Sequence, residues 1–357
     1  MMRVLCVYLT RLFLGRFLFI LAGLVSLMLV LDFLSESDEI IKSGGGGADA
    51  MLRYMWLRLP QILSRSFPMA VLLGALVTMA GLARNSEITA MKAAGVSQLG
   101  LVLALTPAAI MVALPQFWID DRLVPPAVEA LRIWGVGDYE PEFARDPQGN
   151  VWLRHNSDIV RIHSIDLARQ VLGGITIFRR DPQGRVEREI QAERALPDDG
   201  GWMLYDVTVT DPAAGEVQRL DRMAWRKAPG AAALLALASH PREMPLSQLR
   251  RFASHAGTAA GPDYLYAVWL NKRLAMPVAT MLILFLAIPL AQGFSRRAGM
   301  ATILAIGIVI GFLYFTLDGL VLALGEAGLL PPALAAWAPT LVFAAIAGTI
   351  AAQYETR

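Results

Sequence analysis

Six long apolar runs alternate with polar segments along the chain, and a polar insert separates the first three from the last three. The runs lie at residues 17–31, 67–83, within 93–119, and at 274–295, 298–317 and 327–354. A helix needs roughly 20 apolar residues to cross about 30 Å of hydrocarbon, and the flanking Arg16 and Asp32 can snorkel to extend the first run. The pattern predicts an α-helical membrane protein with six transmembrane helices. Helices 1–3 fall in residues 1–136, an inserted domain in 137–261 and helices 4–6 in 262–357.

The insert has the pattern of an all-β domain. Short β-rich pieces recur at residues 151–153, 159–162, 175–178, 188–192, 202–209, 217–220 and 223–225. Turn sequences that begin at Asp146, Asp181, Asp198 and Asp211 separate several of them. Short strands at this spacing are typical of a sandwich or barrel-like domain. We expect residues 229–245 to return in an extended form and Ser247 to cap a short helix at 248–255.

The basic residues predict an orientation. If six spans alternate, one side of the membrane carries Arg3, Arg11, Arg16, Arg84, Lys92, Arg296, Arg297 and Arg357. The positive-inside rule places that side, with both termini, in the cytoplasm and the β domain outside it. On the external side, the glycine run 44–47 predicts a hinge. That hinge would let residues 51–59 fold back as a re-entrant or interfacial segment.

The polar stretch 83–97 between the second and third spans predicts a short cytoplasmic helix at 85–95. Asn85 or Ser86 can cap its start, and Gly95 stands where a left-handed residue ends a helix. Helical spacing places four residues on one small, mostly apolar face with a carboxylate at its end: Glu87, Ala90, Met91 and Ala94. This face suits a groove in another protein. A capped turn that only joins two spans is the alternative.

Composition agrees with a membrane protein and excludes several activities. Of 357 residues, 55% are hydrophobic and 17% charged, against about 25% charged in soluble domains. The net charge of +2 gives no indication of nucleic-acid binding, and the single cysteine, Cys6, excludes an internal disulfide. The sequence lacks a G-x-x-x-x-G-K-[ST] phosphate loop, metal-ligand spacing and the common hydrolase motifs. Transport or scaffolding is therefore favoured over catalysis. The four histidines, His155, His163, His240 and His255, are expected to be surface or half-buried residues and not catalytic ones.

Ionisable residues near the spans allow two interpretations each. Lys272 and Arg273 precede the fourth run and either snorkel to lipid headgroups or bind the phosphate of a lipid substrate. Asp318 is either an interfacial residue or a partner for a nearby cation. Residues 120–122, Asp-Asp-Arg, favour an interface anchor at the end of the third span.

The motifs as a set resemble the lipopolysaccharide-export permeases of the LptF/LptG (YjgP/YjgQ) family. The first half carries F-P-M-A-V-L-L-G-A at 67–75 and S-E-I-T-A-M-K-A-A-G-V-S at 86–97. The second half carries K-R-L-A-M-P at 272–277, G-F-L-Y at 311–314, G-L-L-P-P at 328–332 and W-A-P at 337–339. The form of the first motif and the strand 173–178 resemble the LptG branch more than the LptF branch. An LptF role, or a non-transporting scaffold with a periplasmic binding domain, is the alternative.

The resemblance implies an inner-membrane transport subunit whose insert is a periplasmic β-jellyroll between helices 3 and 4. LptF and LptG pair on two copies of the ATPase LptB, extract lipopolysaccharide, and pass it to LptC and LptA through the jellyrolls. The chain itself would then bind no cofactor, because ATP and Mg²⁺ are used by LptB. The helix at 85–95 would be the coupling helix, with Glu87 meeting a basic residue of LptB and Ala90, Met91 and Ala94 seated in its groove.

One region departs from the family. Basic residues near the external end of helix 1 are implicated there in holding lipid A phosphates, whereas residues 32–42 here are mostly acidic. The phosphate contacts are therefore expected to shift to other cations, or divalent ions would bridge carboxylate to phosphate. The candidate contacts are Lys42, Arg53, Lys272 and Arg273.

Overall fold

Most of the chain folds into helices, and a β-sheet is inserted between them. The computed structural model describes residues 2–43, 47–135, 146, 148–155, 158–166, 171–181, 185–198, 201–212, 215–226, 240–254, 262–294 and 300–355. The chain divides into a helical unit, Met1–Ala127 with Val268–Arg357, and a second unit, Val128–Ala267, which holds the sheet.

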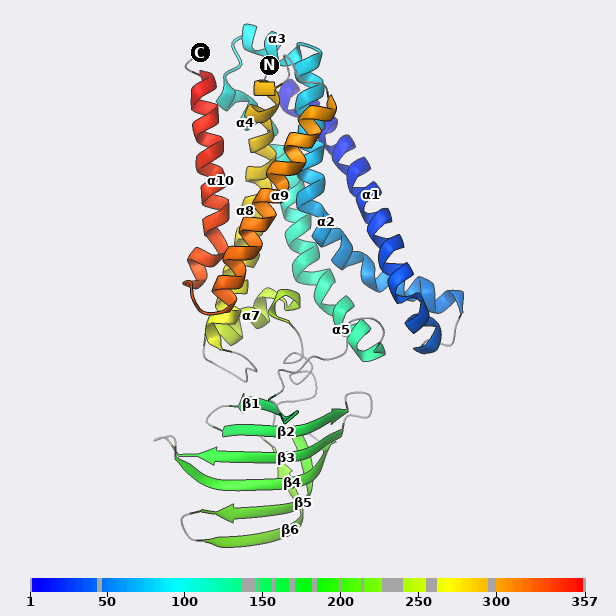
Figure 1. The fold of residues 1–357 in the computed structure, drawn as a ribbon, viewed down its shortest axis with the longest axis vertical. Helices are drawn as coiled ribbons and strands as arrows, with labels where there is room; N and C mark the ends of the chain where they lie inside the picture. Colours follow the sequence, from blue (N-terminus) through cyan, green and yellow to red (C-terminus); the bar gives the residue numbers. More distant parts are fainter. Residues whose placement is uncertain are drawn as a thin grey trace. The chain divides into compact units, whose positions relative to one another are not determined.

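The helices confirm the predicted fold class. In chain order they are α1 (Met2–Ser43), α2 (Ala48–Arg84), α3 (Glu87–Ala93), α4 (Gln98–Trp118), the π-helical turn η1 (Ile119–Leu123), α5 (Val124–Trp134), α8 (Asp263–Phe294), α9 (Met300–Glu326) and α10 (Pro332–Glu355). Within the described residues, six stretches are long and apolar enough to cross a membrane. The start of α1, the end of α10 and α3 lie at the same end of the helical unit (Figure 1), as an even number of crossings requires.

The first two helices are longer than their apolar runs. Residues 51–59, predicted as a re-entrant or interfacial segment that folds back, are not separated from the second span but belong to the continuous helix α2. Arg58 in this part of α2 forms an ion pair with Asp32 of α1, with 2.6 Å between nitrogen and oxygen. A paired charge can stay inside a helix bundle, so the helix does not have to end at it. Gly47 is the N-cap of α2, and the remainder of the predicted glycine hinge lies outside the described residues.

Glycines allow close packing between the helices of this unit. A Cβ atom at Gly74 of α2 would lie 3.0 Å from the Cα atom of Phe17 of α1. Gly307 and Gly311, four residues apart on α9, similarly face leucine side chains of α2. Small residues at this spacing let membrane helices approach closely. At the α1–α2 contact, α1 contributes a buried residue at every fourth position: Leu9, Phe13, Phe17, Leu21 and Val25.

The insert forms one six-stranded antiparallel sheet in sequence order (Figure 1). Its strands are β1 (Val151–His155), β2 (Asp158–Asp166), β3 (Val171–Arg180), β4 (Val186–Asp198), β5 (Gly201–Asp211) and β6 (Glu216–Trp225). The predicted β domain is confirmed, although the two last predicted pieces are one strand. Each strand pairs only with the strands next to it in sequence. The described residues therefore contain no connection that crosses from one sheet to another.

A shift in the alternation of side chains runs across this sheet. Buried hydrophobic residues on β3, β4 and β5 are spaced by two, except at one step of three in each strand: Leu172 to Ile175, Ala192 to Ala195 and Leu204 to Val207. The strand register aligns these steps in a single row. We call this row the crease; it contains His163, Gly174, Glu193, Asp206 and Asp221. Gly174 and Asp206 both have a positive φ there, of 62° and 55°, and a left-handed residue redirects a strand.

The predicted turns separate the strands where expected. The carboxylate of Asp146 organises the turn before β1, because it accepts hydrogen bonds from the backbone N–H groups of Gln148 and Asn150 and from the indole N–H of Trp152, at 2.8–2.9 Å. These bonds, the Trp152 bond foremost, lower the pKa of Asp146 from 3.8 to about 2. Each of them favours the ionised carboxylate.

The region after the sheet differs from the expectation. Residues 229–239 of the predicted extended return lie outside the described residues. A 3₁₀ turn, η2 (Pro241–Glu243), precedes helix α7 (Leu246–Ala253). Ser247 is therefore inside the helix and is not its cap; Pro245 is the N-cap residue. Proline has no N–H to satisfy and its fixed φ suits a helix entry, so the helix starts before the serine.

Gly74→Leu tests the close contact of α1 and α2. The larger side chain has to displace the backbone of Phe17, so we expect a loss of about 1–3 kcal/mol of stability. The measurement is thermal unfolding of the detergent-solubilised protein. Gly23→Leu is the control, because a Cβ atom at that position of α1 meets no atom within 4 Å. Equal unfolding temperatures for the two variants would show that the contact is not tight.

Asp146→Ala tests the turn before β1. A carboxylate with a lowered pKa stabilises the folded state at pH values above its ordinary pKa, and this contribution is lost as the pH falls through its folded value. Hydrogen exchange of residues 150–155 should therefore be faster in the variant at pH 7. The difference in protection should shrink between about pH 4 and about pH 2. Asp181→Ala, in the similar turn before β4, should leave these amides unchanged.

Candidate functional site

The short helix α3 connects α2 to α4 and confirms the predicted helix between these spans. It begins after Ser86, which has a positive φ of 57° and forms no side-chain cap, while Asn85 ends α2. The expected side-chain cap is therefore absent at both residues. The other end is as predicted: Gly95 has φ 85°, its N–H donates to the carbonyl of Lys92, and the N–H of Val96 donates to that of Met91. This paired arrangement fixes where the helix stops.

The two faces of α3 have different surroundings. Ile88 is buried and Met91 packs partly buried against the same hydrophobic core as α1 and α2. Ala90 and Ala94 are exposed, as are the neighbouring Thr89 and Lys92. The residues of the predicted face therefore have two roles. Met91 packs the helix against its own unit, whereas Ala90 and Ala94 form a flat exposed surface of small side chains. Small exposed side chains let the backbone of a partner approach closely.

Glu87 lies at the edge of this surface and is held by a residue that the sequence did not indicate. The hydroxyl of Tyr8 on α1 donates a hydrogen bond to Oε2 of Glu87 at 2.7 Å. The two residues are 79 positions apart in the chain, so spacing could not suggest the contact. A carboxylate that is fixed in this way can pair with a cation of another protein without losing as much side-chain freedom.

Lys272 and Arg273 are buried within the helical unit, with 4% and 5% of their surfaces exposed. The ammonium group of Lys272 pairs with the carboxylate of Asp318 on α9. The guanidinium group of Arg273 donates to the backbone carbonyl of Asp120 in the π-helical turn. The snorkelling interpretation is therefore wrong for both cations, and the interpretation of Asp318 as the partner of a cation is confirmed.

The interpretation of residues 120–122 as an interface anchor is wrong for Asp120, which is 3% exposed. A π-helical turn shifts backbone carbonyls out of the regular α-helical ladder. At Asp120, the carbonyl is used by α8. A second buried contact nearby joins the same helices, since the hydroxyl of Thr280 donates to Oε1 of Gln116 at 2.6 Å. Polar contacts thus attach α8 to α4 on one side and to α9 on the other.

The acidic end of α1 is partly neutralised. Nε of Arg58 lies 2.9 Å from each carboxylate oxygen of Asp32, and the Tyr54 hydroxyl donates to the same carboxylate at 2.9 Å. Of the other candidate lipid contacts, Arg53 is exposed on α2. Lys42 belongs to α1, and its side chain lies outside the described residues.

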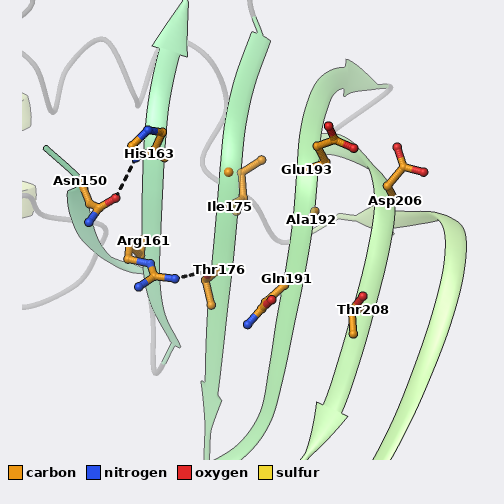
Figure 2. Close-up of a pocket in the computed structure, with 11 residues that line it drawn as sticks. Asn150, Arg161, His163, Ile175, Thr176, Gln191, Ala192, Glu193, Asp206 and Thr208 are labelled. Carbon is orange, nitrogen blue, oxygen red and sulfur yellow. Dashed lines mark hydrogen bonds between the residues drawn. The ribbon is translucent and has the colours of Figure 1, made fainter. Parts of the chain in front are cut away.

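The sheet carries a polar pocket of about 460 Å³ along the crease (Figure 2). Glu193 and Asp206 lie on neighbouring strands there, and Arg161 donates to the hydroxyl of Thr176 at 3.0 Å. The pocket is lined by both donors and acceptors: Asn150, Arg161, His163, Thr176, Gln191, Glu193, Asp206 and Thr208. Such a lining can hydrogen-bond a polar ligand. The described residues contain no group of three His, Cys, Asp or Glu side chains that could hold a metal ion.

The described histidines have structural partners. Nδ1 of His163 lies 3.1 Å from the amide oxygen of Asn150, and Nδ1 of His240 accepts from the backbone N–H of Arg242 at 3.2 Å. The side chain of His155 and the whole of His255 lie outside the described residues.

Lys272→Met tests whether the buried ion pair stabilises the helical unit. Removal of Lys272 leaves the half-buried Asp318 carboxylate, whose side chain is 16% exposed, without its cation, so we expect a loss of at most about 3–5 kcal/mol. The double variant Lys272→Met/Asp318→Leu should recover most of it, because no charge is left uncompensated. The measurement is unfolding in detergent, with the exposed Lys92→Met as the control. Equal stability of the single and double variants would contradict the pairing.

Comparison with known proteins gives a consistent family. A family model described as lipopolysaccharide export system permease LptF/LptG matches residues 7–353. The lipopolysaccharide export system permease protein LptG of Escherichia coli strain K12 is 24% identical over 327 residues, which is 90% of each chain. The protein of the same name from Haemophilus influenzae is 22% identical over 356 residues, which is 94% of each chain. With nearly its whole length matched, the chain belongs to the LptF/LptG family of lipopolysaccharide export system permeases.

Proposed function

We propose that this permease subunit fills the LptG role and that α3 couples it to the separate ATPase LptB. The relatives compared above both carry the name LptG, which favours this branch over LptF. The observation that carries the coupling role is the outward surface of α3: two exposed alanines with the fixed carboxylate of Glu87 at their edge. ATP and Mg²⁺ would be bound by LptB, and this chain would bind no cofactor.

The surface of α3 suits a groove that carries a basic residue. Ala90 and Ala94 allow close approach, and Glu87 offers a negative charge to the groove's edge. Charge complementarity of this kind fixes the register of two partners and speeds their association. Met91 would contribute indirectly, because it packs α3 against the hydrophobic core and so keeps the docking surface in place. Movement of the ATPase would then reach the rest of the helical unit through α3.

The cargo contacts follow from the charges of the helical unit. Arg53 is exposed on α2, and we propose it as a contact for a lipid phosphate, with Lys42 as a second contact. Lys272 and Arg273 would reach a phosphate only after leaving Asp318 and the Asp120 carbonyl. A phosphate could replace those acceptors, because it offers charged oxygens of the same kind. A divalent cation between the carboxylates of α1 and the phosphate is the alternative.

The remaining partners follow from the family. We propose that LptF completes the permease pair, that the sheet is periplasmic, and that it passes lipopolysaccharide to LptC and LptA. Both termini would then be cytoplasmic and the chain would lie in the bacterial inner membrane. The sheet supports this role because its outer strands, β1 and β6, each have one hydrogen-bonding edge that is not paired within the described sheet. Such edges can add a strand from another protein.

Affinity purification of the chain from membranes separates the candidate roles. Recovery of LptB and LptF supports the LptG role. Recovery of LptB and LptG instead assigns the LptF role. A scaffold that binds only a periplasmic protein would bring down no ATPase, and that result would overturn the transport role proposed for α3.

Glu87→Arg tests the coupling role. The reversed charge faces a basic residue of the groove and loses the Tyr8 hydrogen bond, so we expect at least about tenfold less LptB bound to the purified complex. Asp49→Arg is the matched control, since Asp49 is an exposed acidic residue in the first turn of α2. Normal LptB binding, ATP hydrolysis and lipid export by the Glu87 variant would contradict the proposal.

A further inference from the structure

We propose that Tyr8 is a positioning residue for the ATPase-docking surface: its hydroxyl orients the Glu87 carboxylate and attaches the start of α1 to α3. This inference rests on the function proposed for α3. It starts from the 2.7 Å hydrogen bond between Tyr8 and Glu87, which joins two helices that are distant in sequence. The phenol is the donor, because the carboxylate has only acceptors when it is ionised.

The hydrogen bond leaves one carboxylate oxygen for a partner. Tyr8 binds Oε2, and among the described residues no other hydrogen-bond partner of Glu87 is present. A carboxylate can bind two groups at once, one on each oxygen. Oε1 is therefore available to a cation of the ATPase, while Oε2 holds the side chain in one orientation. Without the phenol, a half-exposed glutamate would sample several rotamers and lose more entropy on docking.

The packing below the hydrogen bond makes it a defined contact and not a chance encounter of two surface side chains. Leu9, adjacent to Tyr8, is completely buried, and Ile88, adjacent to Glu87, is 5% exposed. Both belong to the same hydrophobic core. The backbones of α1 and α3 are thus fixed on either side of the Tyr8–Glu87 pair, so the distance between the two side chains is set by the core.

A second contact of α1 strengthens the attachment at this end. Arg16, two turns after Tyr8, donates from Nη1 to the backbone carbonyl of Val77 on α2 at 2.9 Å. The guanidinium group fits there because position 81 is glycine: a Cβ atom would lie 3.0 Å from Nη1. The first turns of α1 are therefore held by α2 through Arg16 and by α3 through Tyr8. A displacement of α3 would be transmitted directly to α1.

The test is a double-mutant cycle on the affinity for the ATPase, with Tyr8→Phe, Glu87→Ala and the double variant in the complete complex. Tyr8→Phe keeps the ring and removes only the hydroxyl. We expect it to weaken ATPase binding about fivefold, the effect of one hydrogen bond to a charged group at an exposed site. In the Glu87→Ala background the same change should have no further effect, because the acceptor is gone. Tyr264→Phe, at another exposed tyrosine, is the control.

The outcomes separate this inference from the proposed function. Weakening by Tyr8→Phe that disappears in the Glu87→Ala background, with unchanged thermal unfolding, supports the positioning role. Wild-type affinity of Tyr8→Phe together with weak binding by Glu87→Ala overturns the role of Tyr8 and leaves the docking role of α3. A Tyr8 effect that persists without Glu87 shows a general structural role and also overturns the inference. Wild-type affinity of Glu87→Ala overturns the docking role itself.

Discussion

The helical unit depends on the neutralisation of charge between helices. A charged side chain at the middle of a membrane helix costs about 2.5–3.5 kcal/mol on insertion scales. Here the charges are matched across helix contacts: Asp32 with Arg58 between α1 and α2, and Lys272 with Asp318 between α8 and α9. Arg273 donates a hydrogen bond to a carbonyl of the π-helical turn. Each of these contacts has a defined geometry. Together they specify which helices are neighbours, whereas apolar side chains in a lipid environment would allow several arrangements.

The link between α2 and α4, which contains α3, is also held by contacts between helices. The start of α1, α2 and α3 share one hydrophobic core, and two polar contacts, through Arg16 and Tyr8, close its edge. The exposed face of α3 therefore belongs to a small assembly of three helices. The helix α3 is not a loose loop, because Ile88, Met91 and the Gly95 turn fix it on its inner side and at its end. Force applied to the exposed alanines is carried by buried contacts.

The sequence predicted the elements better than their limits. The six spans follow from apolar length alone, and α3 follows from a polar stretch with a glycine at its end. The span limits failed at Arg58 and Asp32, because the pattern of one segment does not reveal a partner on another. The role of Tyr8 could not be predicted for the same reason, because it lies 79 residues from its partner Glu87 in the sequence. In the sheet, several predicted strands stopped before consecutive outward residues such as Glu193-Arg194 and Asp221-Arg222. These residues lie at the crease, and the strands continue through them.

The crease restricts how the sheet can change in evolution. Side chains on the two sides of the row have opposite parity along each strand, and the row is aligned from β2 to β6. Loss or gain of one residue within a single strand would turn half of that strand's side chains to the opposite face. Its neighbours could compensate only by the same change at the same row. Insertions and deletions among relatives should therefore occur in the hairpin loops. Within the five strands β2 to β6, the number of residues on each side of the crease should stay constant.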